Sequence, residues 1–286
     1  MISLSKLVIR DSTHLTVSGQ SIYHVYDPHA LVQATGYLKF INGKEYNEGV
    51  FFRGESKLHG SLSPALFRGV SSQNAQSNRI SRLNKEIDSL RRNNQKIFDS
   101  FPQEIHEAIL QHYGLKTSWI DLVDNIWVAL WFACHHAHCT GTSGEYLHFE
   151  KRLLYKEPDG YAYVLLVAAD QGNDARRSPG MYIGKNTELI DLRAAAPSIF
   201  LRPHSQHGLV FRLKGNQVMR PLDYKTQIRG IIRITLADAL AWLGDGRMLG
   251  VHTLFPPPYY DEGYSILLKA GFPPSRDLGA IVHVGA

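Results

Sequence analysis

The feature that most constrains the fold is an uninterrupted apolar run over residues 126–134, which includes Trp127, Trp131 and Phe132. A helix over 125–134 would have almost no polar face, and a helix that is apolar all round is a buried one. The run is too short to cross a bilayer, which takes about 20 apolar residues. The rest of the chain must therefore build a core around this helix.

A second helix is predicted just before this run. Ile105, Ile109 and Tyr113 recur every four residues and would form one buried stripe. Pro102 suits the first turn of such a helix, and Gly114 can take the left-handed conformation that closes it.

A polar loop is expected between the two helices, over residues 115–124. It holds the hydroxyls of Thr117 and Ser118 and the carboxylate of Asp121. Asp124 is expected to cap the buried helix by accepting from its free backbone amides. Loops held between rigid elements often carry functional side chains, so this loop is the first candidate for a site.

The remaining patterns predict a mixture of strands and helices. Residues 161–168 are nearly continuously apolar, which is typical of a central strand, and residues 50–55 form a strand that ends at Gly54. Further strands are expected at 1–27, 209–213, 231–234 and 280–284, helices at 30–40, 80–90, 236–243 and 261–270, turns at 17–20 and 42–43, and an irregular insertion at 141–160. We predict one α+β domain with a mixed, mostly antiparallel β core flanked by helices.

Composition narrows the functional classes. The chain has 286 residues, of which 44% are hydrophobic and 20% charged, as in an ordinary globular protein. Its net charge of +5 and its pI of about 9.1 weakly favour an anionic partner such as a nucleic acid. Cys134 and Cys139 form no spaced framework and the N-terminus lacks a secretory pattern. We therefore expect a cytoplasmic location and no membrane partner.

Several common motifs are absent from the sequence. No Gly-x-Gly-x-x-Gly follows a strand, and neither a Gly-Lys-Ser/Thr loop nor a Gly-x-Ser-x-Gly elbow is present. The segment 134–139 holds two cysteines and three histidines, and on a helix Cys134 would face His138, a pairing that could hold zinc. That spacing matches no standard site, so we expect no metal. The basic face of the 79–96 helix is either solvated or a phosphate-binding surface.

Four stretches together resemble the FRG domain family, which is named for a Phe/Tyr-Arg-Gly motif. They are Phe52-Arg53-Gly54-Glu55, Leu62-Ser63-Pro64-Ala65-Leu66, Gln111-His112-Tyr113-Gly114-Leu115-Lys116-Thr117 with Asp121, and Ala129-Leu130-Trp131-Phe132-Ala133. Weaker matches follow at Arg202 with Gln206-x-Gly208, and at Thr253-Leu254-Phe255-Pro256. The resemblance implies a single FRG domain over 1–286, with an N-terminal extension over 1–45 packed on a core over 46–286.

The central motif departs from the family pattern at several positions. Lys116 stands where the family usually has proline, and Ser118 where it has arginine. Leu122 and Val123 replace a Trp-Thr pair. If that arginine holds a phosphate in the family, Arg53 or Lys116 must do so here.

A fainter similarity, to the ADP-ribosyltransferase superfamily, implies a fold and an activity. A strand with Arg-Gly, followed by a Thr-Ser loop and a helix with Ala-x-x-Phe, is similar to the Arg, Ser-Thr-Ser, Glu plan of those enzymes. In that plan the arginine holds NAD, the hydroxyl orders the active-site strand, and a glutamate steadies the ribosyl cation. Gln206 and Gly208 stand where the glutamate is expected, which leaves Asp121 and Glu55 as candidate carboxylates.

This resemblance implies NAD as the substrate and assigns roles to specific residues. The candidate catalytic residues are His112, Asp121 and Glu55, with His112 as the base on the acceptor side because histidine exchanges protons near neutral pH. An arginine fork matches phosphate oxygens, a tyrosine can stack on nicotinamide, and a glutamine can bind its amide or a ribose hydroxyl. The candidate NAD-binding residues are Arg53, Gly54, Gln111, Tyr113, Thr117, Ser118, Arg202 and Gln206.

The same residues also have structural interpretations. Arg53 could pair with Asp121 only to tie a loop down, and Asp121 could only cap the next helix. His112 could complement the helix dipole, and Tyr113 could belong to the core.

The expected function is that of an NAD-dependent ADP-ribosyltransferase-like enzyme that modifies a DNA or RNA base or a protein. It would act as a toxin or phage-defence effector, with an antitoxin or regulator as a further partner. One alternative is a catalytically silent module that binds nucleotides or nucleic acid. The other is a metal-dependent nuclease that uses His112, Asp121 and the 135–139 cluster.

Overall fold

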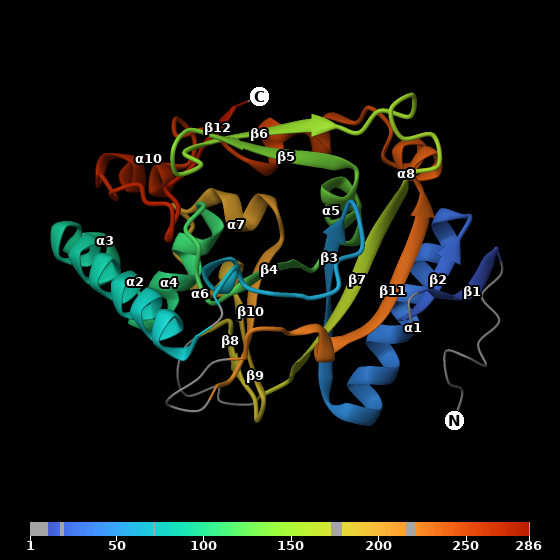
Figure 1. Ribbon diagram of the computed structural model, residues 1–286, viewed down its shortest axis with the longest axis horizontal. Helices are drawn as coiled ribbons and strands as arrows, with labels where there is room; N and C mark the ends of the chain where they lie inside the picture. The colour runs from blue at the N-terminus through green and yellow to red at the C-terminus, as the bar shows by residue number, and fades with distance from the viewer. Residues whose placement is uncertain (1–10, 18–19, 71, 173–178, 216–220, 286) are drawn as a thin grey trace.

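Two β-sheets and the helices around them form a single α+β domain in the computed structural model (Figure 1), which describes residues 11–17, 20–70, 72–172, 179–215 and 221–285. The larger sheet has nine strands in the order β1-β2-β11-β7-β3-β4-β10-β9-β8, and the smaller has three in the order β12-β6-β5. All strand pairs are antiparallel except β11 with β2 and β12 with β6. The predicted α+β class, with a mixed and mostly antiparallel β core flanked by helices, is confirmed.

The strands run as follows: β1 Ser12–Val17, β2 Gln20–Val25, β3 Glu48–Glu55, β4 Ile120–Val123, β5 His135–Thr140, β6 Tyr146–Lys151, β7 Tyr161–Asp170, β8 Met181–Ile183, β9 Thr187–Asp191, β10 Gly208–Leu213, β11 Ile228–Thr235 and β12 His283–Gly285. The helices are α1 Pro28–Tyr46, α2 Gln73–Asn93, α3 Gln95–Phe98, α4 Gln103–His112, α5 Ile126–Ala133, α6 Leu192–Ala195, α7 Leu201–Ser205, α8 Leu236–Leu243, α9 Val251–Leu254 and α10 Glu262–Lys269, with short 3-10 turns at Ala65–Phe67, Lys225–Gln227 and Arg247–Leu249.

The apolar run forms helix α5, as predicted, and it packs on strands β3 and β7 at the centre of the larger sheet. Its buried side chains join those of α1 in one core cluster, so both helices cover the same face of the sheet. Strand β7 is almost wholly buried, which matches its continuous apolar sequence. A second cluster joins α2 and α4 to the β9 and β10 half of the sheet, where Figure 1 shows these helices at the left.

The cap of α5 differs from the prediction. Asn125 is the N-cap, because its side chain accepts from the backbone amides of Trp127 and Val128. Asp124 instead pairs with Lys39 and Arg193, which ties α1 and α6 to the start of α5.

Several local predictions were wrong. The loop expected at 115–124 contains strand β4, which holds Asp121, so Asp121 does not cap a helix. The turn expected at 42–43 lies inside α1, and the insertion at 141–160 contains β6. The segment 135–140 is strand β5 and not a helix, so Cys134 and His138 do not share a helical face. The last strand is shorter than expected, and the turn at 17–20 includes residues outside those described.

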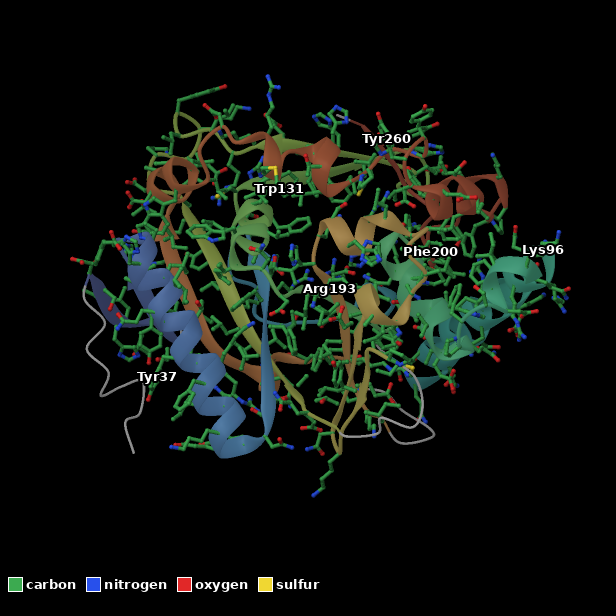
Figure 2. The ribbon with its side chains drawn as sticks, turned by 180° about the vertical axis from the view of Figure 1, so that it is seen from behind. Tyr37, Lys96, Trp131, Arg193, Phe200 and Tyr260 are labelled. Atoms are coloured by element: carbon green, nitrogen blue, oxygen red, sulfur yellow. The ribbon has the colours of Figure 1, made fainter. Side chains whose placement is uncertain are left out.

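The small sheet closes one end of the molecule. Figure 1 shows β5, β6 and β12 lying across the top of the view, next to α5. Trp131 of α5, labelled in Figure 2, joins the two layers. Its ring stacks on His135 with centroids 4.0 Å apart and meets Phe149 of β6 at 5.3 Å. Among the described residues, no helix has both the length and the apolar character needed to span a bilayer.

Candidate functional site

A cavity of about 500 Å³ lies where β3 and β4 meet α4, α7 and the small sheet. Its polar lining includes Arg53, Glu55, Gln111, Asp121, Arg202 and Gln206. Its apolar wall includes Phe132, Phe149 and Phe255. A mostly apolar hollow of this size with a few converging polar groups is typical of a small-molecule site.

Arg53 ties the two strands of the polar wall together. Its Nε donates to Glu55 Oε1 at 2.6 Å, and its Nη1 donates to the backbone oxygen of Asp121 at 2.9 Å. Burial lowers the pKa of Arg53, but the charges of Glu55 and Asp121 raise it by more, so the guanidinium stays charged. No described residue accepts from Nη2, which leaves one edge of the fork for a ligand.

Asp121 is held by two side chains of α4. Gln111 Nε2 donates to Asp121 Oδ2 at 2.8 Å, and His112 Nδ1 lies 3.1 Å from Oδ1. Burial raises the pKa of Asp121, but the hydrogen bonds and charge of His112, with help from Gln111 and Arg53, outweigh it and lower the pKa overall. The side chain is 42% exposed, so a charged carboxylate faces the open part of the site.

Thr117 orients the Gln111 side chain that holds Asp121. Its Oγ1 donates to Gln111 Oε1 at 2.6 Å, which fixes the amide so that its NH₂ group faces Asp121. The hydroxyl therefore orients a pocket residue but does not line the pocket itself. Ser118 is also fully buried, and its backbone amide and hydroxyl both donate to Glu107 Oε1. Neither Thr117 nor Ser118 lines the pocket, so their positions do not support the binding roles predicted for them.

His112 is positioned to orient Asp121 and not to take a proton from an acceptor. Its Nδ1 faces Asp121, and its buried Nε2 has no described partner. The imidazole packs against Gly208, where an added Cβ would lie 2.2 Å from His112 Nε2. This contact explains why a glycine follows Gln206 by two positions.

Tyr113 and Gly54 also have structural roles. Tyr113 is fully buried, and its hydroxyl donates to Asp261 Oδ2 at 2.7 Å. It is not in the pocket wall, so it is not positioned to stack on nicotinamide. Gly54 borders the pocket, but its more stringent role is to let the backbone of α5 approach β3.

Arg202 in the first turn of α7 and Gln206 at its C-cap both reach the pocket. Arg202 is 1% exposed, lies over the rings of Tyr113 and Tyr264 at 4.4 and 4.7 Å, and donates from Nη1 to the backbone oxygen of His112. Burial lowers its pKa. Gln206 Nε2 donates to the backbone oxygen of Leu254 at 2.8 Å, which leaves its carbonyl oxygen for the pocket. The predicted proximity of Arg53, Asp121 and Gln206 is therefore present.

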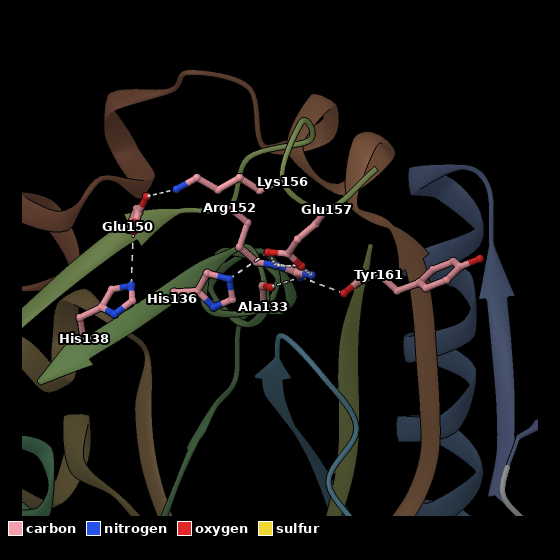
Figure 3. A network of polar contacts seen from close by, with 8 residues as sticks. All are labelled: Ala133, His136, His138, Glu150, Arg152, Lys156, Glu157 and Tyr161. Carbon is pink, nitrogen blue, oxygen red and sulfur yellow. Dashed lines mark hydrogen bonds and ion pairs between the residues drawn. The ribbon is translucent and has the colours of Figure 1, made fainter. Parts of the chain in front are cut away.

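The roof of the pocket is fixed by a polar network (Figure 3). The buried Arg152 donates to the backbone oxygens of Ala133 and Tyr161 and pairs with Glu157, which also contacts His136 at 2.9 Å. His138 Nε2 lies 3.4 Å from Glu150 Oε2 on β6. Across the described residues, no three His, Cys, Asp or Glu side chains are grouped as metal ligands.

Glu157 is expected to stabilise the roof in a pH-dependent way. Hydrogen bonds from Arg152 lower its pKa to about 2, against an ordinary 4.5. A lowered pKa stabilises the fold above pH 4.5, and that contribution is lost as the pH falls toward 2. Glu157→Gln should cost about 2 kcal/mol at pH 7 because the charge-assisted bonds weaken. Urea unfolding at pH 7 and pH 3 measures this, and a difference that does not shrink at pH 3 contradicts it.

The sequence did not identify the aromatic wall. Phe149 of β6 and Phe255 after α9 pack with ring centroids 4.6 Å apart, and Phe132 of α5 meets Phe255 at 6.1 Å. These three residues are far apart in the chain. The motifs that contain Phe132 and Phe255 were recognised, but nothing in their spacing indicates that they meet.

Comparison with known proteins identifies a family domain that contains part of this site. Residues 48–140 match the family model of the FRG domain. No curated protein and no solved structure matches the chain. The matched range runs from β3 to β5 and contains Arg53, Gln111 and Asp121, while Arg202 and Gln206 lie beyond it. Residues 48–140 of this chain therefore form an FRG domain.

Proposed function

We propose that this chain is an ADP-ribosyltransferase-like enzyme that consumes NAD and modifies a nucleic acid or a protein. One observation carries the proposal: an arginine with an open edge and two carboxylates, Glu55 and Asp121, line the same pocket as an aromatic wall. Such an activity suits a toxin or phage-defence effector that an antitoxin or regulator restrains.

The residues suit the parts of a dinucleotide. Arg53 Nη2 offers donors to a phosphate, and arginine binds phosphate oxygens with a planar fork. The rings of Phe132, Phe149 and Phe255 offer an apolar surface for a planar base. Gln206 offers a carbonyl oxygen to an amide or a hydroxyl.

The chemistry assigned to Asp121 is electrostatic. Cleavage of the nicotinamide–ribose bond develops positive charge on the sugar, as in glycoside hydrolysis. A fixed carboxylate next to that carbon stabilises the charge without reorganising during the reaction. Gln111 and His112 hold Asp121 in place for this role. Glu55 holds Arg53 and supplies the second negative charge.

The test is release of nicotinamide from NAD by the purified chain, with and without DNA, RNA or protein acceptors. Release is expected to be unaffected by a chelator, whereas a metal-dependent nuclease would lose its activity. Binding of NAD with no turnover under any condition would contradict the proposal and support a silent binding module.

Glu55→Gln is expected to lower kcat/KM for NAD about tenfold, since a neutral partner holds Arg53 less firmly in a charge-assisted pair. Its matched control is Asp245→Asn, because the Asp245 side chain is 97% exposed and lies outside the pocket. Equal rates for the two variants would contradict the role of Glu55.

A further inference from the structure

A second hollow, of about 940 Å³, lies against the first. The two share a wall that contains Arg53, Glu55, Gln111 and Asp121. The opposite wall of the second hollow comes from residues 59–70 and from Leu222. A group-transfer enzyme must bring a donor and an acceptor to the same catalytic groups, and two hollows that meet at two carboxylates provide this arrangement.

The second hollow contains a second arginine. Arg68 is exposed there, with its Nε 3.4 Å from the backbone oxygen of Ser63 and no described partner for either Nη group. The pKa of Arg68 is lowered, first because the walls of the hollow take part of the side chain out of water and then because the charge of Arg53 is near, while Glu55 and Asp121 raise it. Two guanidinium groups that repel each other across one hollow form a site that an anion would stabilise. The other titratable group in the wall is His59, 3.8 Å from Glu55.

The floor of this hollow is apolar and carries an unused donor. Leu62, Phe67 and Ile120 are almost wholly buried there. Trp119, 2% exposed, belongs to the same wall, and its Nε1 has no acceptor among the described residues. An apolar floor with an unsatisfied indole N–H beside it suits a flat heterocycle that bears a carbonyl or ring nitrogen.

We propose that the second hollow binds one nucleotide of a single-stranded nucleic acid, which is the acceptor. The phosphate of the acceptor nucleotide lies against Arg68, and its base lies on the apolar floor beside the carboxylates. A base must leave its stack to reach such a site, which favours a single strand over a duplex. This inference rests on the proposed function for the reaction, but not for binding.

The reaction balances with groups that are present. Attack by a base N–H on ribose C1′ forms the new glycosidic bond, while the bond from C1′ to nicotinamide N1 breaks and its electron pair neutralises the pyridinium. Glu55 takes the proton of the attacking N–H. His59 lies near Glu55 and can pass that proton to solvent, because the His59 side chain is 52% exposed. The products are the ADP-ribosylated base, nicotinamide and one proton.

Binding is tested without NAD, by fluorescence anisotropy of labelled single-stranded DNA and RNA, of a duplex, and of an acidic peptide. Arg68→Ala should weaken single-strand binding about tenfold and reduce the slope of log K against log salt by about one. The control is Arg92→Ala, which removes the same charge from the exposed face of α2 and should change binding less than about twofold. Equal losses in both variants, no binding of single strands by the wild type, or preference for the peptide would each overturn the proposal.

Measuring the hydrolysis of NAD without an acceptor distinguishes a failure of this inference from a failure of the proposed function. Arg68→Ala should leave KM for NAD unchanged in that reaction. A raised KM would mean that Arg68 holds a phosphate of NAD, and the acceptor assignment would fail. If no NAD is cleaved but strand binding still depends on Arg68, the proposed reaction fails and the nucleic-acid site stands.

Discussion

Replacing Gly54 with alanine is expected to destabilise the fold by more than about 4 kcal/mol, enough to unfold a protein of ordinary stability. A Cβ at this position would lie 1.8 Å from the backbone oxygen of Ala129, 2.8 Å from its carbonyl carbon and 2.9 Å from the amide nitrogen of Ala133. These are backbone atoms of a buried helix, and they cannot move aside as the end of a flexible side chain can. Helix α5 would have to leave β3.

The measurement is urea unfolding or thermal melting of the purified variants. Gly36→Ala is the matched control, because it adds the same methyl group inside α1, where nothing lies within 4 Å of the new atom. The control should be neutral or more stable by up to about 1 kcal/mol, as alanine favours helix. A Gly54→Ala variant that melts near the wild type would show that α5 does not approach β3 this closely.

The family motif therefore combines two separate requirements on one strand. Arg53 and Gly54 alternate across β3, so they face opposite sides of the sheet. Arg53 contacts Glu55 and β4 on the side of the second hollow, while Gly54 admits the backbone of α5 on the other side. One residue supplies chemistry, and its neighbour allows the packing that holds the strand in place.

The elements that were predicted correctly are those whose sequence pattern allows only one interpretation. The run that became α5 is apolar at every position, and β7 is nearly so, and both were found where expected. Strand β4 was missed because it is only four residues long and has a carboxylate in its middle, a pattern that indicates a loop. Strand β5 was misread because cysteine and histidine spacing suggested helical pairs, while pairing with β6 decides its conformation.

The candidate site was predictable in part for a similar reason. Arg53, Gln111 and Asp121 lie in recognisable motifs, and the structure brings them together. Which of the motif residues face inward could not be read from the motif. Tyr113, Thr117 and Ser118 are adjacent in the chain to pocket residues, yet all three are fully buried behind them. Arg68 gave no motif signal, because its position depends on how residues 59–70 fold over the sheet.

Asp121→Asn is expected to lower kcat for NAD cleavage about 10²- to 10³-fold, which is the usual effect of removing one preorganised electrostatic group. KM should change little, because Arg53 bonds to the backbone oxygen of Asp121 and not to its carboxylate. Asparagine keeps the size of the side chain and one oxygen acceptor, so the variant should stay folded. Asp245→Asn serves again as the exposed control and should keep the wild-type rate.

The pH profile provides a second, independent check on Asp121. Its pKa is lowered in the folded chain, so the carboxylate stays charged at and above its ordinary pKa of 3.8 and is neutralised only below that value. The wild-type rate should therefore show no acid limb from Asp121 between about pH 5 and pH 7. A fall in the wild-type rate below about pH 6 that is absent in Asp121→Asn would mean that burial raises the pKa of Asp121 by more than the hydrogen bonds from His112 and Gln111 lower it. Asp121 would then be a proton donor or acceptor and not a fixed negative charge.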